Sequence, residues 1–146
     1  MNNKLRNLIE QLHPALEELR KGAPYENRRE MPLKGLYLFS DGRNHLYVGR
    51  SNNIPVRYAT HRSIRGTLAF ILASESYRRK VPKDMRYQKE LFLSEPKFRD
   101  HLRDAQRRIR KMSFRAVAEG DQVRQALLEV YCAVALDTRY NDFSTH

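Results

Sequence analysis

Four side chains that can bind phosphate or move a proton occur within 25 residues of sequence: Tyr37, Tyr47, Arg57 and His61. An arginine keeps its charge at any working pH, and its planar guanidinium matches the oxygens of a phosphate group. The imidazole of His61, with an ordinary pKa near ~6.5, can accept or relay a proton. A tyrosine, with a pKa near ~10, can do so only where a neighbouring cation favours the phenolate. These residue types together suit chemistry on a phosphate ester.

A β-hairpin must position the two tyrosines. Two β-type segments, 35–40 and 45–50, flank the turn-forming residues 41–44 (Asp-Gly-Arg-Asn), and this pattern predicts a hairpin. Gly35 and Gly49 lie on the expected strands, where a glycine permits close approach of backbone to backbone or to substrate.

A helix must follow the hairpin and position the two basic side chains. Residues 51–53 (Ser-Asn-Asn) offer N-cap side chains, and Pro55 fits the first turn because its fixed φ and missing N–H are tolerated there. Arg57 and His61 are then four residues apart on one face. Taken singly, each of these residues is more often a packing or surface residue, so the interpretation depends on their coincidence.

A second group of polar residues lies near the C-terminus, with Glu129 followed twelve residues later by Asn141. Asp121 predicts the start of a helix over about 122–136. On a helical wheel, the expected core face is apolar: Val123, Leu127, Val130 and Val134. Glu129 projects more than ~90° from that face, on a side with Gln125, Cys132 and Ala133, and this position suits an ion ligand lining a cleft. A lone glutamate in a helix is more often a surface residue.

These two groups together resemble the GIY-YIG nuclease superfamily. The residues that carry the resemblance are Gly35-Leu36-Tyr37, Tyr47-Val48-Gly49, Arg57 and His61, then Ala126-Leu127-Leu128-Glu129 and Asn141. They occur in the order and at the spacing typical of the family, within residues 34–61 and 112–142. Either group alone would be weak, because glycine, tyrosine and Leu-Leu-Glu are common.

The resemblance implies an endonuclease that cuts DNA with one divalent ion, Mg²⁺ or Mn²⁺, held by Glu129. It implies that Tyr37 contacts the attacking water and acts as general base, although His61 could accept the proton instead. Arg57 is expected to bind a nonbridging phosphate oxygen, Tyr47 to orient the water or phosphate, and Asn141 to brace the site by hydrogen bonds. Which group is the base stays open, and so does the choice between DNA and RNA, because hydrolysis with a metal does not need the 2′-OH.

The positive charge of the chain is concentrated between the two groups. Residues 62–115 contain 16 Lys and Arg against 6 Asp and Glu, a net charge of +10 in a chain of net charge +11. Such a segment is typical of phosphate-backbone binding, although a solvated helical face is the plainer explanation. The residues expected to bind nucleic acid are Arg50, Arg62, Arg65, Arg99, Arg103, Arg107, Arg110 and Lys111. A binding protein that has lost catalysis is the alternative to a nuclease.

Periodicity predicts further helices over residues 1–21, 67–74, 84–93 and 96–111, and a third strand over 112–118. The expected fold is α+β: a small three-stranded antiparallel sheet flanked by helices, with an added N-terminal helix and a helical insertion. One domain is expected, made of four segments: 1–33 (helix and connector), 34–61 (hairpin and catalytic helix), 62–111 (basic insertion) and 112–146 (strand, glutamate helix and tail).

The remaining composition narrows the class of protein. A single cysteine, Cys132, excludes an internal disulfide and fits a reducing cytoplasm. No apolar segment has the ~20 residues of a membrane helix, so a cytoplasmic protein without a membrane partner is expected. The leucine stripe of residues 1–21 packs either on this domain or on a second copy, which would make a homodimer.

Overall fold

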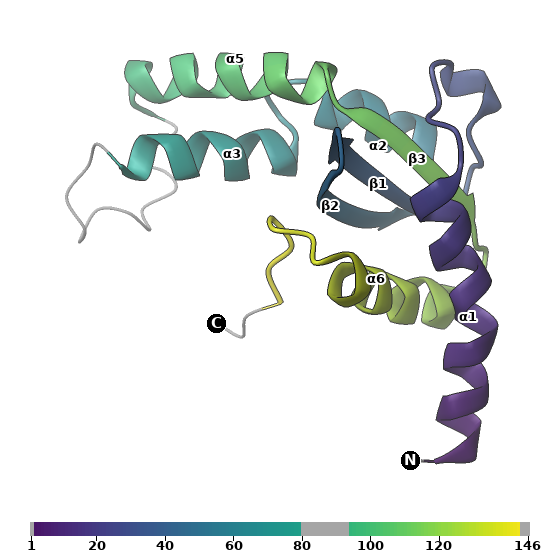
Figure 1. The fold of residues 1–146 in the computed structure, drawn as a ribbon. Helices are drawn as coiled ribbons and strands as arrows, with labels where there is room; N and C mark the ends of the chain where they lie inside the picture. Colours follow the sequence, from purple (N-terminus) through teal and green to yellow (C-terminus); the bar gives the residue numbers. More distant parts are fainter. Residues whose placement is uncertain (1, 80–93, 144–146) are drawn as a thin grey trace. The chain divides into compact units, whose positions relative to one another are not determined.

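The computed structural model describes residues 2–79 and 94–143. By its contacts the chain divides into two compact units (Figure 1). The sheet unit consists of Met1–Arg57 with Met112–His146, and the helical unit is Tyr58–Lys111. The helix predicted over 84–93 lies outside the described residues. Among the described helices, none is both long and apolar enough to cross a membrane.

The sheet unit is built on three antiparallel strands, as predicted, and their order is β2-β1-β3. They are β1 (Gly35–Asp41), β2 (Asn44–Ser51) and β3 (Ser113–Ala118). The loop between β1 and β2 has two residues, and its first, Gly42, has a φ of 59°, as a type II′ turn requires. A shift of register after Phe39 interrupts the hairpin, so that Phe39 pairs with Tyr47 but Ser40 pairs with His45.

Two helices cover one face of this sheet, α1 (Asn3–Lys21) and α6 (Gln122–Leu136) (Figure 1). The core between them is made of Leu12, Leu16 and Leu19 from α1, Leu128 and Cys132 from α6, and Leu36, Leu38, Val48 and Val117 from the strands. The leucine stripe of α1 therefore packs within its own unit. Its N-terminal end stays open at Leu5, which is 44% exposed, and a homodimer through α1 stays a prediction.

The buried face of α6 differs from the predicted one. Val123, Val130 and Val134 are 66%, 47% and 74% exposed, whereas the buried residues are Gln125, Leu128, Cys132 and Ala133. The helical wheel placed the valines on the core face and put Gln125, Cys132 and Ala133 beside Glu129, on a side expected to line a cleft and not to be packed. Gln125 is instead buried because its side-chain amide donates to the carbonyl of Glu119 at 2.6 Å, which satisfies a group that is otherwise costly to bury.

The remaining helices are α2 (Ile54–His61), α3 (Thr67–Arg78) and α5 (Pro96–Arg110). The α2 helix follows the N-cap residue Asn53, whose side chain accepts from the Val56 N–H at 3.3 Å, and the boundary between the two units falls within it. In the helical unit, α3 packs against α5 through aromatic contacts of Phe98. The predicted core face of α5 is confirmed: Phe98, Leu102, Ala105 and Ile109 are buried.

Candidate active site

The ring of Tyr37 lies against Gly49, its partner on the neighbouring strand. A Cβ at position 49 would lie 2.2 Å from the Tyr37 hydroxyl oxygen. The ring also stacks on Phe114, with centroids 5.6 Å apart, and Tyr37 is only 1% exposed. Gly49 is thus needed to let this tyrosine lie flat across the hairpin.

Gly35 is needed for a different close approach. A Cβ at this position would lie 1.9 Å from the carbonyl oxygen of Val117 on β3. The prediction for both glycines was close approach of backbone to backbone or to substrate. Gly35 makes the first of these, to the backbone of β3, whereas Gly49 makes room for the side chain of Tyr37.

Four of the predicted site residues interact electrostatically within the sheet unit. Tyr37 and Tyr47 lie with ring centroids 6.4 Å apart. The charge of Arg57 lowers the pKa of both phenols, and Arg57 also forms a hydrogen bond with Tyr37. The charge of Glu129 raises the pKa of both phenols. These residues come from β1, β2, α2 and α6, so the fold brings together side chains up to 92 positions apart in sequence.

Both phenols are protonated at neutral pH, as tyrosines ordinarily are, and burial favours the protonated form further. The pKa of Tyr37 is raised well above its ordinary value, chiefly by burial and then by Tyr47, and Arg57 opposes this rise only in part. Burial also raises the pKa of Tyr47, against the effect of Arg57. In this arrangement the tyrosines are hydrogen-bond donors and acceptors, and a phenolate base would need a cation in addition to Arg57.

Glu129 binds the backbone of β2 at the edge of the sheet. The Glu129 carboxylate accepts a hydrogen bond from the backbone N–H of Arg50. Burial raises the pKa of Glu129, and the charge and the N–H of Arg50 offset this rise only in part. The side chain is half-buried. A carboxylate in this state gains from a nearby cation, because the cation offsets the loss of water around the charge.

Asn141 binds the same edge of β2 at Val48, two residues before Arg50. Its amide oxygen accepts from the Val48 N–H at 2.8 Å, and its amide nitrogen donates to the Val48 carbonyl at 2.7 Å. The Thr138 hydroxyl donates to the same amide oxygen at 2.7 Å. Both polar groups of the Asn141 side chain therefore bind the backbone of Val48, which lies between Tyr47 and Gly49. Asn141 thus fixes the position of this part of β2. Thr138 was missed in the sequence, where no spacing singles it out.

His61 belongs to the helical unit and its side chain is fully buried (0% exposed). The structure therefore gives this imidazole no access to bulk solvent, and its role as proton acceptor stays a prediction. Arg62, predicted to bind nucleic acid, places its guanidinium 5.0 Å from the centroid of the Tyr58 ring and donates to the Tyr58 hydroxyl.

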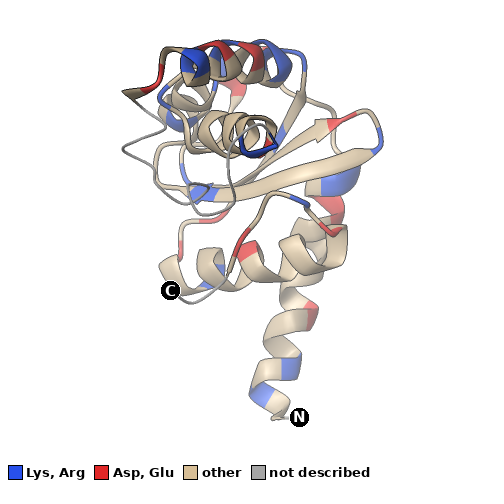
Figure 2. Ribbon diagram, turned by 90° about the vertical axis from the view of Figure 1, so that its left-hand side faces the viewer, with Lys and Arg blue, Asp and Glu red and all other residues tan. Residues whose placement is uncertain are grey.

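The other predicted nucleic-acid contacts are exposed arginines and one lysine. Arg50 lies on β2, Arg65 precedes α3, and Arg99, Arg103, Arg107, Arg110 and Lys111 lie on or at the end of α5. Acidic residues are interspersed with the basic ones along α5 (Figure 2). Asp100 forms an ion pair with Arg103 at 3.8 Å, and Asp104 forms one with Arg107 at 2.8 Å. Neither Arg99 nor Arg110 makes an ion pair with a described carboxylate.

One carboxylate is available to hold a metal ion at this site. Within residues 2–79 and 94–143, no group of three or more His, Cys, Asp or Glu side chains could hold a metal ion. A single carboxylate such as Glu129 is enough for Mg²⁺, because this ion keeps most of its water ligands and binds proteins through one or two carboxylates. Comparison of the chain with protein-family models, with curated proteins and with solved structures gave no match.

Proposed function

We propose that this protein is a metal-dependent endonuclease that hydrolyses phosphodiester bonds in DNA, single- or double-stranded. The observation that carries the proposal is the grouping of Tyr37, Tyr47, Arg57 and Glu129, which interact electrostatically although they come from four different elements. A protein that only binds nucleic acid has no use for a half-buried carboxylate beside a permanently charged guanidinium and two phenols. The resemblance to the GIY-YIG superfamily adds to this argument.

Arg57 is the residue that binds the scissile phosphate. Its charge is permanent, and its planar fork can contact two phosphate oxygens as negative charge develops on them. The hydrogen bond between Arg57 and Tyr37 holds the guanidinium beside the phenol. In this proposal Arg57 links the phosphate to Tyr37, which is itself only 1% exposed.

The two tyrosines orient the reacting groups. Both hydroxyls are protonated at neutral pH, and burial favours this form. The half-buried Tyr47 can therefore donate to a phosphate oxygen and accept from the attacking water, and Tyr37 acts through its hydrogen bond with Arg57. The proton lost by that water must go to a group with a lower pKa than these phenols, or to Tyr37 once a further cation has lowered its pKa.

Glu129 is the ligand that would hold one Mg²⁺ or Mn²⁺. The Arg50 N–H occupies one acceptor position of its carboxylate, and the other positions are available to a hydrated ion. An ion bound there would supply Lewis-acid polarisation of the phosphate and stabilise negative charge on the leaving oxygen.

Cleavage of matched nucleic acids tests the proposal. Labelled single-stranded DNA, double-stranded DNA and RNA of one sequence are incubated with Mg²⁺ and the wild-type protein, Arg57→Gln, or the control Arg6→Gln on the exposed end of α1. We expect DNA to be cut, and Arg57→Gln to slow cleavage about 10²–10³-fold with the control unchanged. Cleavage of RNA alone would change the substrate class, and binding without any cleavage would favour the alternative of a binding protein.

A further inference from the structure

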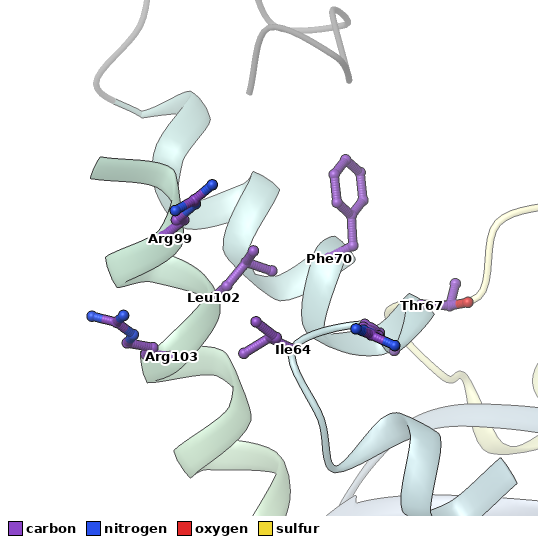
Figure 3. A pocket seen from close by; sticks show the side chains of 8 residues that line it. Ile64, Thr67, Phe70, Arg99, Leu102 and Arg103 are labelled. Atoms are coloured by element: carbon purple, nitrogen blue, oxygen red, sulfur yellow. The ribbon is translucent and has the colours of Figure 1, made fainter. Parts of the chain in front are cut away.

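The helical unit contains a cavity of about 600 Å³ that the proposed active site does not use. It lies between the N-terminal end of α3 and the N-terminal half of α5 (Figure 3). This volume is within the range of small-molecule sites, about 300–1,000 Å³. All the residues that line it belong to the helical unit. We call it the α3–α5 pocket.

One part of the pocket is apolar. Ile64, Phe70 and Leu102 line it, and Figure 3 shows Leu102 with Arg99 on one side and Phe70 on the other. Ile64 is 48% exposed, whereas Leu102 is 5% exposed. An aromatic ring and two branched aliphatic side chains around one cavity can hold a flat ring by stacking and apolar contact.

The pocket also has cationic lining residues: Arg65, Arg99 and Arg103. Arg103 pairs with Asp100 at 3.8 Å, whereas within the described part of the chain neither Arg65 nor Arg99 makes an ion pair with a carboxylate. Gly66, the N-cap residue of α3, also lines the pocket and provides no side-chain cap. The first turn of α3 contains no acidic residue, so the positive end of the helix dipole adds to the two guanidinium groups. These cationic groups suit a ligand that carries a phosphate group.

We propose that the α3–α5 pocket binds one unpaired nucleotide, with its base against Phe70 and Leu102 and its phosphate held by the lining arginines, Arg99 first. This inference rests on the proposed nuclease function and names the form of its substrate: a strand with at least one unstacked base. In a duplex the bases are stacked and paired, so only phosphates and sugars could reach the arginines and the apolar part would have no partner. A phosphate alone would have no use for Phe70.

Binding measured without catalysis tests this inference. A single strand carrying the fluorescent base 2-aminopurine and a duplex of the same sequence are titrated in EDTA with wild type, Phe70→Leu and Arg99→Gln. The charge control is Arg108→Gln, which changes an exposed arginine of α5 that does not line the pocket. We expect Phe70→Leu to weaken single-strand binding at least about fivefold, with duplex binding unchanged. Arg99→Gln should weaken single-strand binding more than Arg108→Gln does.

Phe70 contacts Phe98, so Phe70→Leu could disturb the helical unit. Ile64→Asn is a second variant at an exposed loop position, and it should also weaken single-strand binding while leaving the thermal unfolding midpoint unchanged. Equal losses for single strand and duplex, or no loss for any pocket variant, would overturn the inference. Cleavage with Mg²⁺ is measured separately. If the wild type cuts DNA but the pocket variants bind single strands as tightly as wild type does, only the pocket is rejected. If the pocket variants weaken single-strand binding but the wild type cuts nothing, only the nuclease function is rejected.

Discussion

The hydroxyl of Tyr37 occupies the space that a side chain at position 49 would need, with only 2.2 Å between its oxygen and a Cβ placed on Gly49. Both residues belong to the hairpin, and they are direct partners in its register. Tyr37 cannot move aside, because it is 1% exposed and packs on Phe39 and Phe114. The glycine and the tyrosine therefore form one structural unit.

Gly49→Ala should lower both stability and cleavage. Forcing a methyl group into a filled site costs about 1–3 kcal/mol, and the displaced Tyr37 loses its position beside Arg57. The free energy of unfolding in urea measures the first effect and single-turnover cleavage the second. Gly120→Ala is the matched control, because a Cβ there meets nothing within 4 Å. Equal behaviour of the two variants would show that Tyr37 does not need a glycine beneath it.

Asn141→Ala should destabilise the sheet unit by about 1–3 kcal/mol, since it leaves the N–H and carbonyl of the fully buried Val48 without partners. Thr138→Val is a milder variant, because it removes one hydrogen bond to Asn141 and keeps both bonds to Val48. Urea unfolding should rank wild type above Thr138→Val, and Thr138→Val above Asn141→Ala. If Asn141→Ala were as stable as wild type, water would be replacing the amide at this edge.

Glu129→Gln should raise the thermal unfolding midpoint at neutral pH without metal. Burial raises the folded-state pKa of Glu129 above 4.5, so its contribution to stability is fully present below pH 4.5 and is lost as the pH rises through the folded pKa. The amide keeps an acceptor for the Arg50 N–H and carries no charge. The gain should therefore shrink when unfolding is measured below pH 4.5, and a gain that did not depend on pH would contradict this explanation.

Mg²⁺ should stabilise the wild-type protein and leave Glu129→Gln unchanged, because a ligand that binds only the folded state raises its unfolding midpoint. Thermal unfolding over a Mg²⁺ titration provides this comparison without any cleavage assay. Glu10→Gln, on the exposed part of α1, is the control for charge removal. An equal response of Glu129→Gln and wild type would place the ion elsewhere.

Tyr37 should keep its proton through the pH range in which exposed tyrosines ionise, near pH ~10, because burial raises its pKa. The ultraviolet absorbance of tyrosinate measures this. Wild type and Tyr37→Phe should give the same tyrosinate signal in that range. One additional ionisation in the wild type near pH ~10 would contradict a raised pKa for Tyr37.

The local pattern of the sequence predicted the elements of the sheet unit well. Turn residues around Gly42, the N-cap at Asn53 and alternation over 112–118 each act over a few neighbours, and the hairpin, α2 and β3 lie where they indicate. The three-stranded sheet and the core face of α5 are confirmed for the same reason. Local rules suffice to predict where these elements begin and end.

Features that depend on distant partners were predicted less well. The α6 wheel was wrong because the burial of Gln125 depends on the carbonyl of Glu119, and hydropathy alone does not reveal such a partner. The contact of Asn141 with Val48 spans 93 positions, so only the resemblance indicated that this asparagine matters. The α3–α5 pocket depends on two helices meeting, and no spacing in the sequence marks it.

Cleavage of labelled single- and double-stranded DNA under single-turnover conditions is the sharpest test of a nuclease centred on Glu129. Wild type is compared with Glu129→Gln, with the control Glu10→Gln, and with wild type in EDTA. We expect cutting by wild type and Glu10→Gln in Mg²⁺ and loss of cutting by Glu129→Gln and in EDTA, with DNA binding retained in every case. Cutting that survives Glu129→Gln would contradict a metal site at this carboxylate, and a wild type that binds DNA without cutting it would contradict the nuclease itself.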